Sequence, residues 1–180
     1  DNQSKVSSTP ISKKQNFYPK FKTVDGISHV QAVASKAGII RTENAFEGVI
    51  FKGVGADYRW DNMQEYLAEG KLPNLSDALN DEVVISQFLA NRLNLKVGDK
   101  FNAFFMKEEG NKLPNLRVFE ITGIYNSGFQ EFDEMFVLGD IRHIQRMNKW
   151  KADQVGSFEV FLDDFDQIET KGKEVYDETG

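Results

Sequence analysis

The sequence contains no cysteine, and it has only two histidines among its 180 residues. Without cysteine the chain can form no disulfide, no thiolate zinc site and no thiol nucleophile. The two imidazoles belong to His29 and His143, and zinc usually takes three or four protein ligands. We therefore predict that both histidines are ordinary surface or half-buried side chains.

Long apolar runs and an excess of positive charge are also lacking. No apolar run approaches the roughly 20 residues that a membrane-spanning helix needs, and no signal peptide is visible. Acidic residues outnumber basic ones by 28 to 22, which gives a net charge of −6. Phosphate-rich partners favour clustered Lys and Arg, so this balance argues against nucleic acid and against anionic membranes. The polar ends, residues 1–4 and 177–180, look like cuts through a longer protein.

The motifs of common enzyme sites are missing. Gly53 and Gly55 begin a G-x-G pattern, but Tyr58 stands where a dinucleotide fingerprint needs its third glycine. No G-x-S-x-G segment offers a hydrolase nucleophile. Carboxylates cluster at 131–134 and 163–166, and we interpret them as solvated loop charge and a helix N-terminus rather than calcium sites. The sequence thus predicts no catalytic residue, no cofactor and no metal.

What the chain does have is aromatic bulk and alternating helix and strand patterns. Fifteen phenylalanines can fill a core at this length. Residues 29–41 and 46–54 predict an antiparallel hairpin with its turn near Asn44. Residues 58–68 predict a helix that stops at Gly70, and residues 1–16 predict a loosely held segment.

The best-defined local pattern begins at residue 82. Residues 82–85 predict a strand, and Ser86 is a suitable N-cap for a helix over 87–93. Phe88, Leu89 and Leu93 predict its buried stripe, and Asn94 can take the left-handed stop. Further strands are predicted over 101–106, 116–125, 135–138 and 157–162, with helices that begin after Asp140 and Asp164.

Two places combine apolar side chains with a polar loop, and both are candidate binding surfaces. The first is the loop Lys107 to Asn115 beside Met106, and the second is the pair Phe129 and Phe132 next to Gly128. The alternative is that members of each apolar group simply enter the core. The sequence supports the binding surface and the core interpretation about equally.

The order of these segments resembles the periplasmic domain of ABC-transporter permeases of the MacB-like core type, in the FtsX-like superfamily. Residues 123–128, Gly-Ile-Tyr-Asn-Ser-Gly, followed by Glu131-Phe132-Asp133, are most similar to the lipoprotein-releasing permeases LolC and LolE. Residues 46–57, 70–73 and 82–100 extend the resemblance.

The resemblance implies an α+β fold with two lobes. Residues 1–57 and 141–180 would form a mixed α and β membrane-proximal lobe. Residues 58–69 would form a connecting helix, and residues 70–140 a smaller β-rich inserted lobe. Membrane helices would lie outside both ends, which implies the periplasmic domain of a bacterial inner-membrane protein.

The resemblance also implies a non-catalytic role in transport. The permease would be driven by a cytosolic ATPase subunit, would pair with a second permease subunit, and would release lipoproteins to a periplasmic carrier. The carrier-recruiting loop would contain Lys107, Asn111, Lys112, Leu113, Pro114 and Asn115. Met106, Phe129 and Phe132 are the candidates for an apolar cargo or partner surface. The alternatives are a MacB-like efflux permease that engages a periplasmic adaptor and an FtsX-like regulator of a cell-wall hydrolase.

Overall fold

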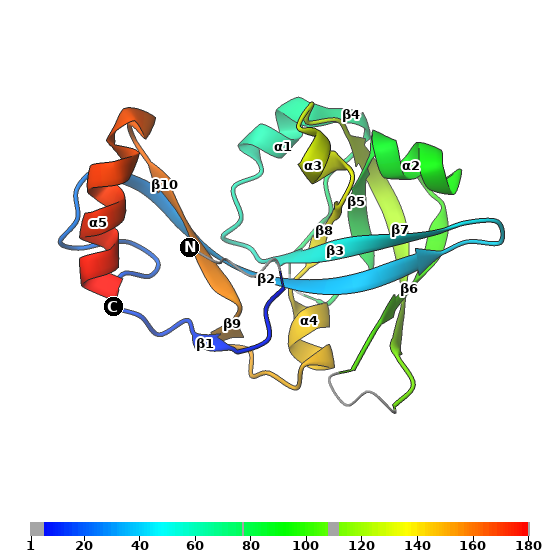
Figure 1. Ribbon diagram of the computed structural model, residues 1–180, viewed down its shortest axis with the longest axis horizontal. Helices are drawn as coiled ribbons and strands as arrows, with labels where there is room; N and C mark the ends of the chain where they lie inside the picture. The colour runs from blue at the N-terminus through cyan, green and yellow to red at the C-terminus, as the bar shows by residue number, and fades with distance from the viewer. Residues whose placement is uncertain (1–5, 77, 108–111, 180) are drawn as a thin grey trace.

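Six strands close into a barrel in the computed structural model, which describes residues 6–76, 78–107 and 112–179 (Figure 1). Each of these strands pairs with two of the other five, and the ring runs β2, β3, β8, β5, β7, β6 and back to β2. The pairs β3–β8 and β5–β7 are parallel and the other four are antiparallel. Because the ring is closed, each strand has a paired neighbour on both sides, and along those paired residues it has no free edge. The bounds are β2 Ile27–Arg41, β3 Phe46–Val54, β5 Glu82–Ser86, β6 Lys100–Phe105, β7 Asn115–Tyr125 and β8 Phe136–Asp140.

The remaining elements decorate this barrel. β4 (Leu67–Gly70) pairs with β7, and β10 (Ser157–Leu162) pairs with the first half of β2. In Figure 1, β10 and helix α5 (Ile168–Thr179) lie to one side of the barrel. β1 and β9 form a separate two-stranded pair. Their bounds and those of the other helices are β1 Ile11–Ser12, β9 Gln154–Val155, α1 Asp61–Tyr66, α2 Gln87–Leu93, α3 Gln130–Asp133, α4 Arg142–Met147 and the 3₁₀ turn Phe165–Gln167.

Aromatic rings fill the inside of the barrel. Phe51 stacks on Phe119 with ring centroids 5.0 Å apart, and Phe105 meets Phe51 edge-on at 6.0 Å. All three side chains are at most 1% exposed. Full burial of one such ring stabilises the fold by about 1.5–3 kcal/mol. Part of the phenylalanine content anticipated as core material thus fills the barrel, whereas Phe46, Phe129 and Phe165 are exposed.

Several expected local features are confirmed. The β2–β3 hairpin pairs Arg41 with Phe46, which places its turn at residues 42–45. The Ser86 hydroxyl accepts a hydrogen bond from the Leu89 N–H at 3.0 Å and so caps α2. Asn94 ends that helix with φ 52° and ψ 48°. These features are set by neighbours in the chain, which is why the sequence predicts them.

Other expectations need correction. The helix predicted over 58–68 spans only Asp61–Tyr66, because the next four residues form β4 against β7. Gly70 therefore lies in a strand rather than at a helix stop. Phe88 is 38% exposed and does not join the buried stripe of α2. Within the segment expected to be loose, β1 pairs with β9.

Within the described ranges, no helix is both long and apolar enough to cross a membrane.

Candidate functional site

The β6–β7 hairpin carries the loop that the sequence singled out. Its strands pair from Lys100 with Glu120 to Phe105 with Asn115, so Asn115 is the first residue of β7 rather than part of the loop. Phe101, Ala103 and Phe105 point inward and are at most 4% exposed. Since β6 also pairs with β2, the stem is fixed on two sides. The end of the stem where β6 stops and β7 begins lies at the lower edge of the barrel in Figure 1.

The loop at the end of this stem presents apolar side chains to solvent. Leu113 is 84% exposed and Met106 is 59% exposed. Lys107 and Lys112 are exposed beside them, and Pro114 is half-buried. Asn111 lies outside the described residues. Burying a side chain such as Leu113 against a partner stabilises a complex by up to about 1.5–3 kcal/mol, so the loop can supply binding energy as well as charge.

The structure does not bring the two predicted apolar groups together. Met106 follows β6 at the hairpin loop, whereas Phe129 precedes α3 beyond the other end of β7. The eleven residues of β7 span roughly 30 Å. Phe129 is 66% exposed, but Phe132 stacks on Phe136 at 4.8 Å and packs in a core cluster. Phe132 is thus half-buried, as one of the two alternatives at the sequence level anticipated.

An exposed apolar face on the outside of the barrel went unnoticed in the sequence. Ile39 of β2 lies opposite Phe104 of β6, which lies opposite Leu116 of β7, so the three side chains share one face. Ile39 and Leu116 are 43% and 47% exposed, and Val118 on the same face is 46% exposed. The sequence did contain a signal for this face. Inward-facing and outward-facing positions alternate along β6 and β7, and apolar residues occur at both kinds of position.

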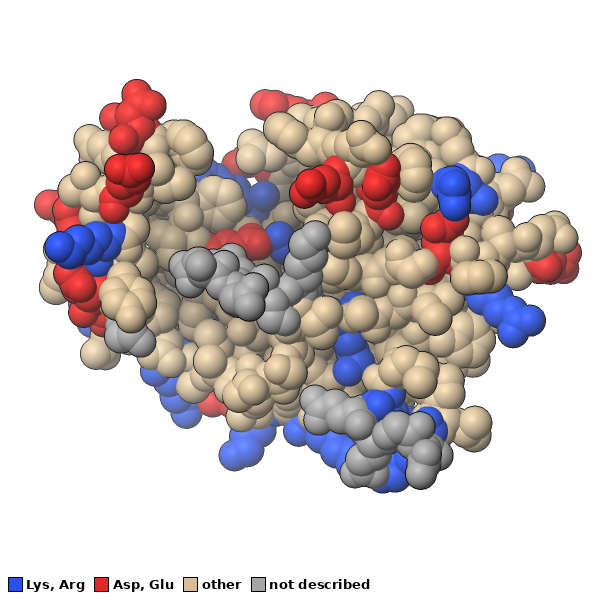
Figure 2. Space-filling view, in the orientation of Figure 1, with Lys and Arg blue, Asp and Glu red and all other residues tan. Residues whose placement is uncertain are grey.

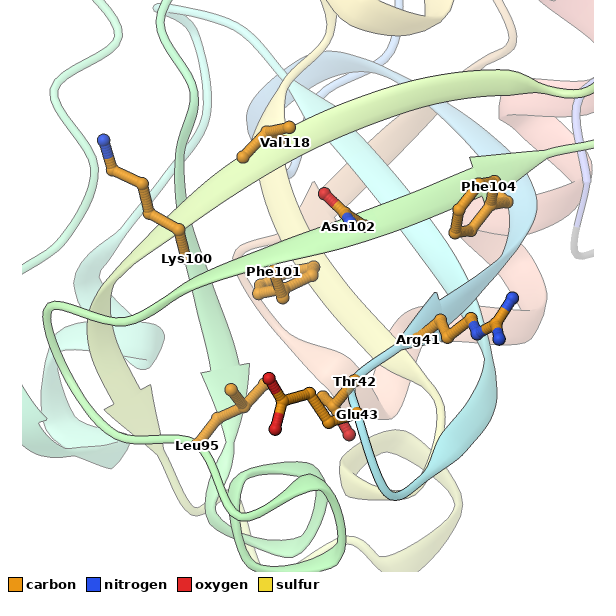
Figure 3. Close-up of a pocket in the computed structure, with 9 residues that line it drawn as sticks. All are labelled: Arg41, Thr42, Glu43, Leu95, Lys100, Phe101, Asn102, Phe104 and Val118. Atoms are coloured by element: carbon orange, nitrogen blue, oxygen red, sulfur yellow. The ribbon is translucent and has the colours of Figure 1, made fainter.

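A recess of about 520 Å³ borders this face (Figure 3). Leu95, Phe101, Phe104 and Val118 give it apolar surface, and one carboxylate and two cations lie among its other lining residues. These are Glu43, Arg41 and Lys100. Such a lining suits contact with a partner that is apolar at its centre and charged at its rim.

The motif at residues 127–133 proves to be structural. Asp133 is 8% exposed, and its carboxylate accepts hydrogen bonds from the Ser127 hydroxyl at 2.5 Å and from the Gly128 N–H at 3.2 Å. The Ser86 hydroxyl in turn donates to the Asp133 carbonyl. Asp133 therefore closes the turn before α3 and ties it to α2, which corrects its interpretation as solvated charge. Among the residues that the structure describes, no group of three or more acidic or histidine side chains could hold a metal ion.

Asp57 is a further organising residue that sequence reasoning missed. One oxygen of its carboxylate accepts hydrogen bonds from the Tyr18 hydroxyl at 2.7 Å and from the Ala32 N–H at 2.8 Å. Its backbone carbonyl lies 2.8 Å from Nε2 of the half-buried His29. Burial and then the neighbouring carboxylate raise the pKa of Tyr18. Asp57 thus ties the segment after β3 to β2 and to the N-terminal part of the chain.

His143 is buried rather than superficial. The residue is 1% exposed, and its ring meets that of Phe119 edge-on at 5.0 Å. Its Nε2 lies 2.8 Å from the Asn80 carbonyl, and no partner for Nδ1 is found in the described part of the chain. Burial lowers the pKa of this imidazole below its ordinary value of 6.5, although Asn80 and the carboxylates of Asp81 and Asp140 partly oppose the shift.

This lowered pKa predicts an acid-sensitive stability. The unfolded chain takes up a proton at His143 below about pH 6.5, whereas the folded chain resists it, so stability is lost as the pH falls below that value. The loss has an upper limit of about 1.4 kcal/mol per pH unit from one group. Urea unfolding between pH 7.5 and 5.5 measures it. In His143→Gln this part of the pH dependence is expected to disappear, and an equal slope in both proteins would show that other groups cause it.

Comparisons with known proteins bear on the fold. No protein-family model and no curated protein matches the chain. It is similar to the extracellular domain of the noncanonic ABC-type transporter YknZ from Gram-positive bacteria, with a TM-score of 0.60 and 18% identity over 91% of this chain and 79% of that one. A domain of a permease protein from Porphyromonas gingivalis aligns with a TM-score of 0.44 and 13% identity, over 98% of this chain and 79% of that one. The first similarity shows that the chain has the α+β fold, with a mixed sheet, of a permease extracellular domain.

Proposed function

We propose that this chain is the extracytoplasmic domain of an ABC-transporter permease and performs no catalysis itself. One observation carries the proposal: the segments whose order resembles such permeases fold into a barrel similar to the YknZ extracellular domain over 91% of the chain. Both the sequence order and the fold support the same conclusion. The ATPase that drives such a permease would be a separate cytosolic subunit, and a second permease subunit would complete the membrane part.

The finer proposal is that the permease releases lipoproteins from the inner membrane to a periplasmic carrier. The resemblance of residues 123–133 to LolC and LolE supports it, as does the exposed apolar loop on the β6–β7 stem. In this proposal Leu113 and Met106 enter an apolar site on the carrier while Lys107 and Lys112 contact its rim. Phe129 is too distant along β7 to join that contact and would face a different partner or the cargo.

A second candidate is a permease that engages a periplasmic adaptor, as the MacB-like transporters do. The structural similarity to YknZ, which is described as a noncanonic ABC-type transporter, favours this candidate over hydrolase regulation. The outer face formed by Ile39, Phe104, Leu116 and Val118 offers an adaptor a second contact area beside the loop.

The division into two lobes belongs to the same proposal. The membrane-proximal lobe, residues 1–57 and 141–180, would connect to the membrane helices, and residues 70–140 would form the inserted lobe. Both parts contribute strands to the closed barrel, since β2 and β3 pair with β6 and β8. The lobes would therefore share a core, and a movement of one would be transmitted to the other.

Depletion of the full-length protein in its own cell tests the transport role. Inner and outer membranes are separated after depletion, and the distribution of acylated lipoproteins between them is measured. Accumulation in the inner membrane supports lipoprotein release. Normal sorting would contradict it and leave the adaptor-linked permease as the function that the fold supports.

The substitution Leu113→Asp tests the loop. A charge in place of the exposed leucine cannot enter an apolar site without losing its hydration, so the affinity for a purified lipoprotein carrier is expected to fall at least tenfold, or about 1.4 kcal/mol. Phe165→Asp is the matched control, because Phe165 is 76% exposed and lies just before α5, away from the hairpin. Unchanged affinity in Leu113→Asp would remove the loop from the carrier interface.

A further inference from the structure

Basic side chains from three separate parts of the chain line one groove of about 420 Å³. We call this the basic groove. β2 contributes one of its cations, the two sides of the β6–β7 hairpin contribute three, and the end of α4 contributes two. They are Lys36, Lys107, Lys112, Arg117, Arg146 and Lys149. Figure 2 shows blue side chains gathered along the lower edge of the molecule, while red ones dominate its upper edge.

The groove departs from the charge balance of the rest of the protein. No carboxylate belongs to its described lining, although the chain as a whole carries a net charge of −6. Some cations elsewhere are paired with carboxylates, as Lys52 is with Glu159 and Arg142 with Asp140. Among the described residues, no carboxylate pairs with Lys107, Arg117, Arg146 or Lys149.

Two of the groove cations are held in place by hydrogen bonds. The Lys36 Nζ donates to the Asn148 Oδ1 at 2.7 Å, and the Arg117 Nη1 donates to the Leu116 carbonyl at 2.8 Å. Lys149 has a φ of +57°, a left-handed conformation that favours Gly or Asn over lysine. The backbone alone thus gives no reason for a lysine at this position.

The dipole of α4 does not explain the cluster. Cations near a helix C-terminus are favourable, which would apply to Arg146 and Lys149. The helix has only six residues, however, and Lys36, Lys107 and Arg117 come from β2 and the β6–β7 hairpin. A ligand that interacts with cations from all three elements accounts for the whole set.

We propose that the basic groove binds a phosphate group, carried by a phosphate ester or a diphosphate. Phosphate oxygens accept charge-assisted hydrogen bonds from several Lys and Arg side chains at once. The volume is in the range of small-ligand sites. Trp150 and Met147 add apolar surface on which the organic part of such a ligand can lie. A soluble phosphate ester and a lipid headgroup share this chemistry. The inference does not rest on the proposed transport function.

Calorimetric titration of the 180-residue chain with inorganic pyrophosphate is the first test, and co-sedimentation with vesicles is the second. The groove variant combines Arg117→Gln, Arg146→Gln and Lys149→Gln. The control combines Lys22→Gln, Lys71→Gln and Lys173→Gln, which removes the same charge from exposed side chains outside the groove. We expect the groove variant to bind pyrophosphate at least tenfold more weakly than the natural chain, and the control to stay within about twofold.

The vesicle arm distinguishes the source of the phosphate. Co-sedimentation with phosphatidylglycerol vesicles but not phosphatidylcholine vesicles, lost in the groove variant alone, assigns the site to a lipid headgroup. Pyrophosphate binding without vesicle binding assigns it to a soluble ligand. A second measurement keeps the test valid if the triple variant fails to fold. In a Trp60→Phe chain Trp150, which lines the groove, is the remaining tryptophan, and its fluorescence during the pyrophosphate titration reports binding there.

Three outcomes would overturn the proposal. The first is that neither pyrophosphate nor the anionic vesicles bind. The second is an equal loss of binding in the groove variant and the control, which would show a net-charge effect. The third is tighter binding of a polyglutamate peptide than of pyrophosphate, which would assign the groove to an acidic protein segment.

Discussion

Replacing Phe119 by alanine is expected to destabilise the protein by about 3–5 kcal/mol, the range for removing a buried phenylalanine ring. Phe119 is 1% exposed and touches Phe51, Phe101 and the His143 ring at centroid distances of 5.0 to 5.9 Å. The cavity would open at the centre of the barrel, between β7 and β3. Neighbouring strands pair on both sides there, so little collapse can offset the loss.

Urea unfolding followed by circular dichroism measures this effect. Phe46→Ala is the matched control, since it removes the same ring from a site that is 75% exposed. Its effect is expected to be within about 0.5 kcal/mol, as for most surface substitutions. Similar unfolding midpoints for both variants would show that the aromatic cluster inside the barrel does not dominate stability.

Gly70→Ala is expected to cost about 2–4 kcal/mol through two separate effects. Gly70 has a φ of +76°, which is unfavourable for alanine. A Cβ at this position would also lie 2.1 Å from the Thr122 carbonyl oxygen. Because this oxygen belongs to the backbone of β7, and also accepts from the Lys71 N–H, β4 must shift to make room.

Gly128→Ala separates the two effects. Gly128 has a φ of +77°, but a Cβ there would meet nothing within 4 Å. We expect it to lose only the conformational part, about 1 kcal/mol. Thermal unfolding of both variants gives the comparison. If Gly70→Ala costs no more than Gly128→Ala, then β4 can move freely and its pairing with β7 contributes little to stability.

The local features of this fold were predictable because their causes lie within a few residues of one another. The cap at Ser86, the left-handed Asn94 and the β2–β3 turn all depend on hydrogen bonds or backbone angles of chain neighbours. The stem of the β6–β7 hairpin follows from the alternation along its two strands.

Features that depend on distant pairing were not predictable. Leu67–Gly70 continue a helical pattern in the sequence, but pairing with β7 makes them a strand. The sequence predicts a surface or half-buried side chain for His143 and solvated loop charge for Asp133. Only the tertiary structure shows that both are buried, beside the Phe119 ring and the Ser127 hydroxyl respectively. In each case tertiary contacts override a weak local preference.

The sequence by itself determined that the chain is an α+β protein with a large aromatic core, one well-capped helix and an exposed hairpin loop, and it predicted no catalytic residue. Only the tertiary structure decided how the strands join. Closure requires residues 39–41 to pair with residues 102–104, and no local signal encodes that register. The same closure gathers Lys36, Arg117 and Lys149 into one groove on a protein whose net charge is −6. A net charge sums over all residues, whereas a binding site depends on which of them the fold places side by side.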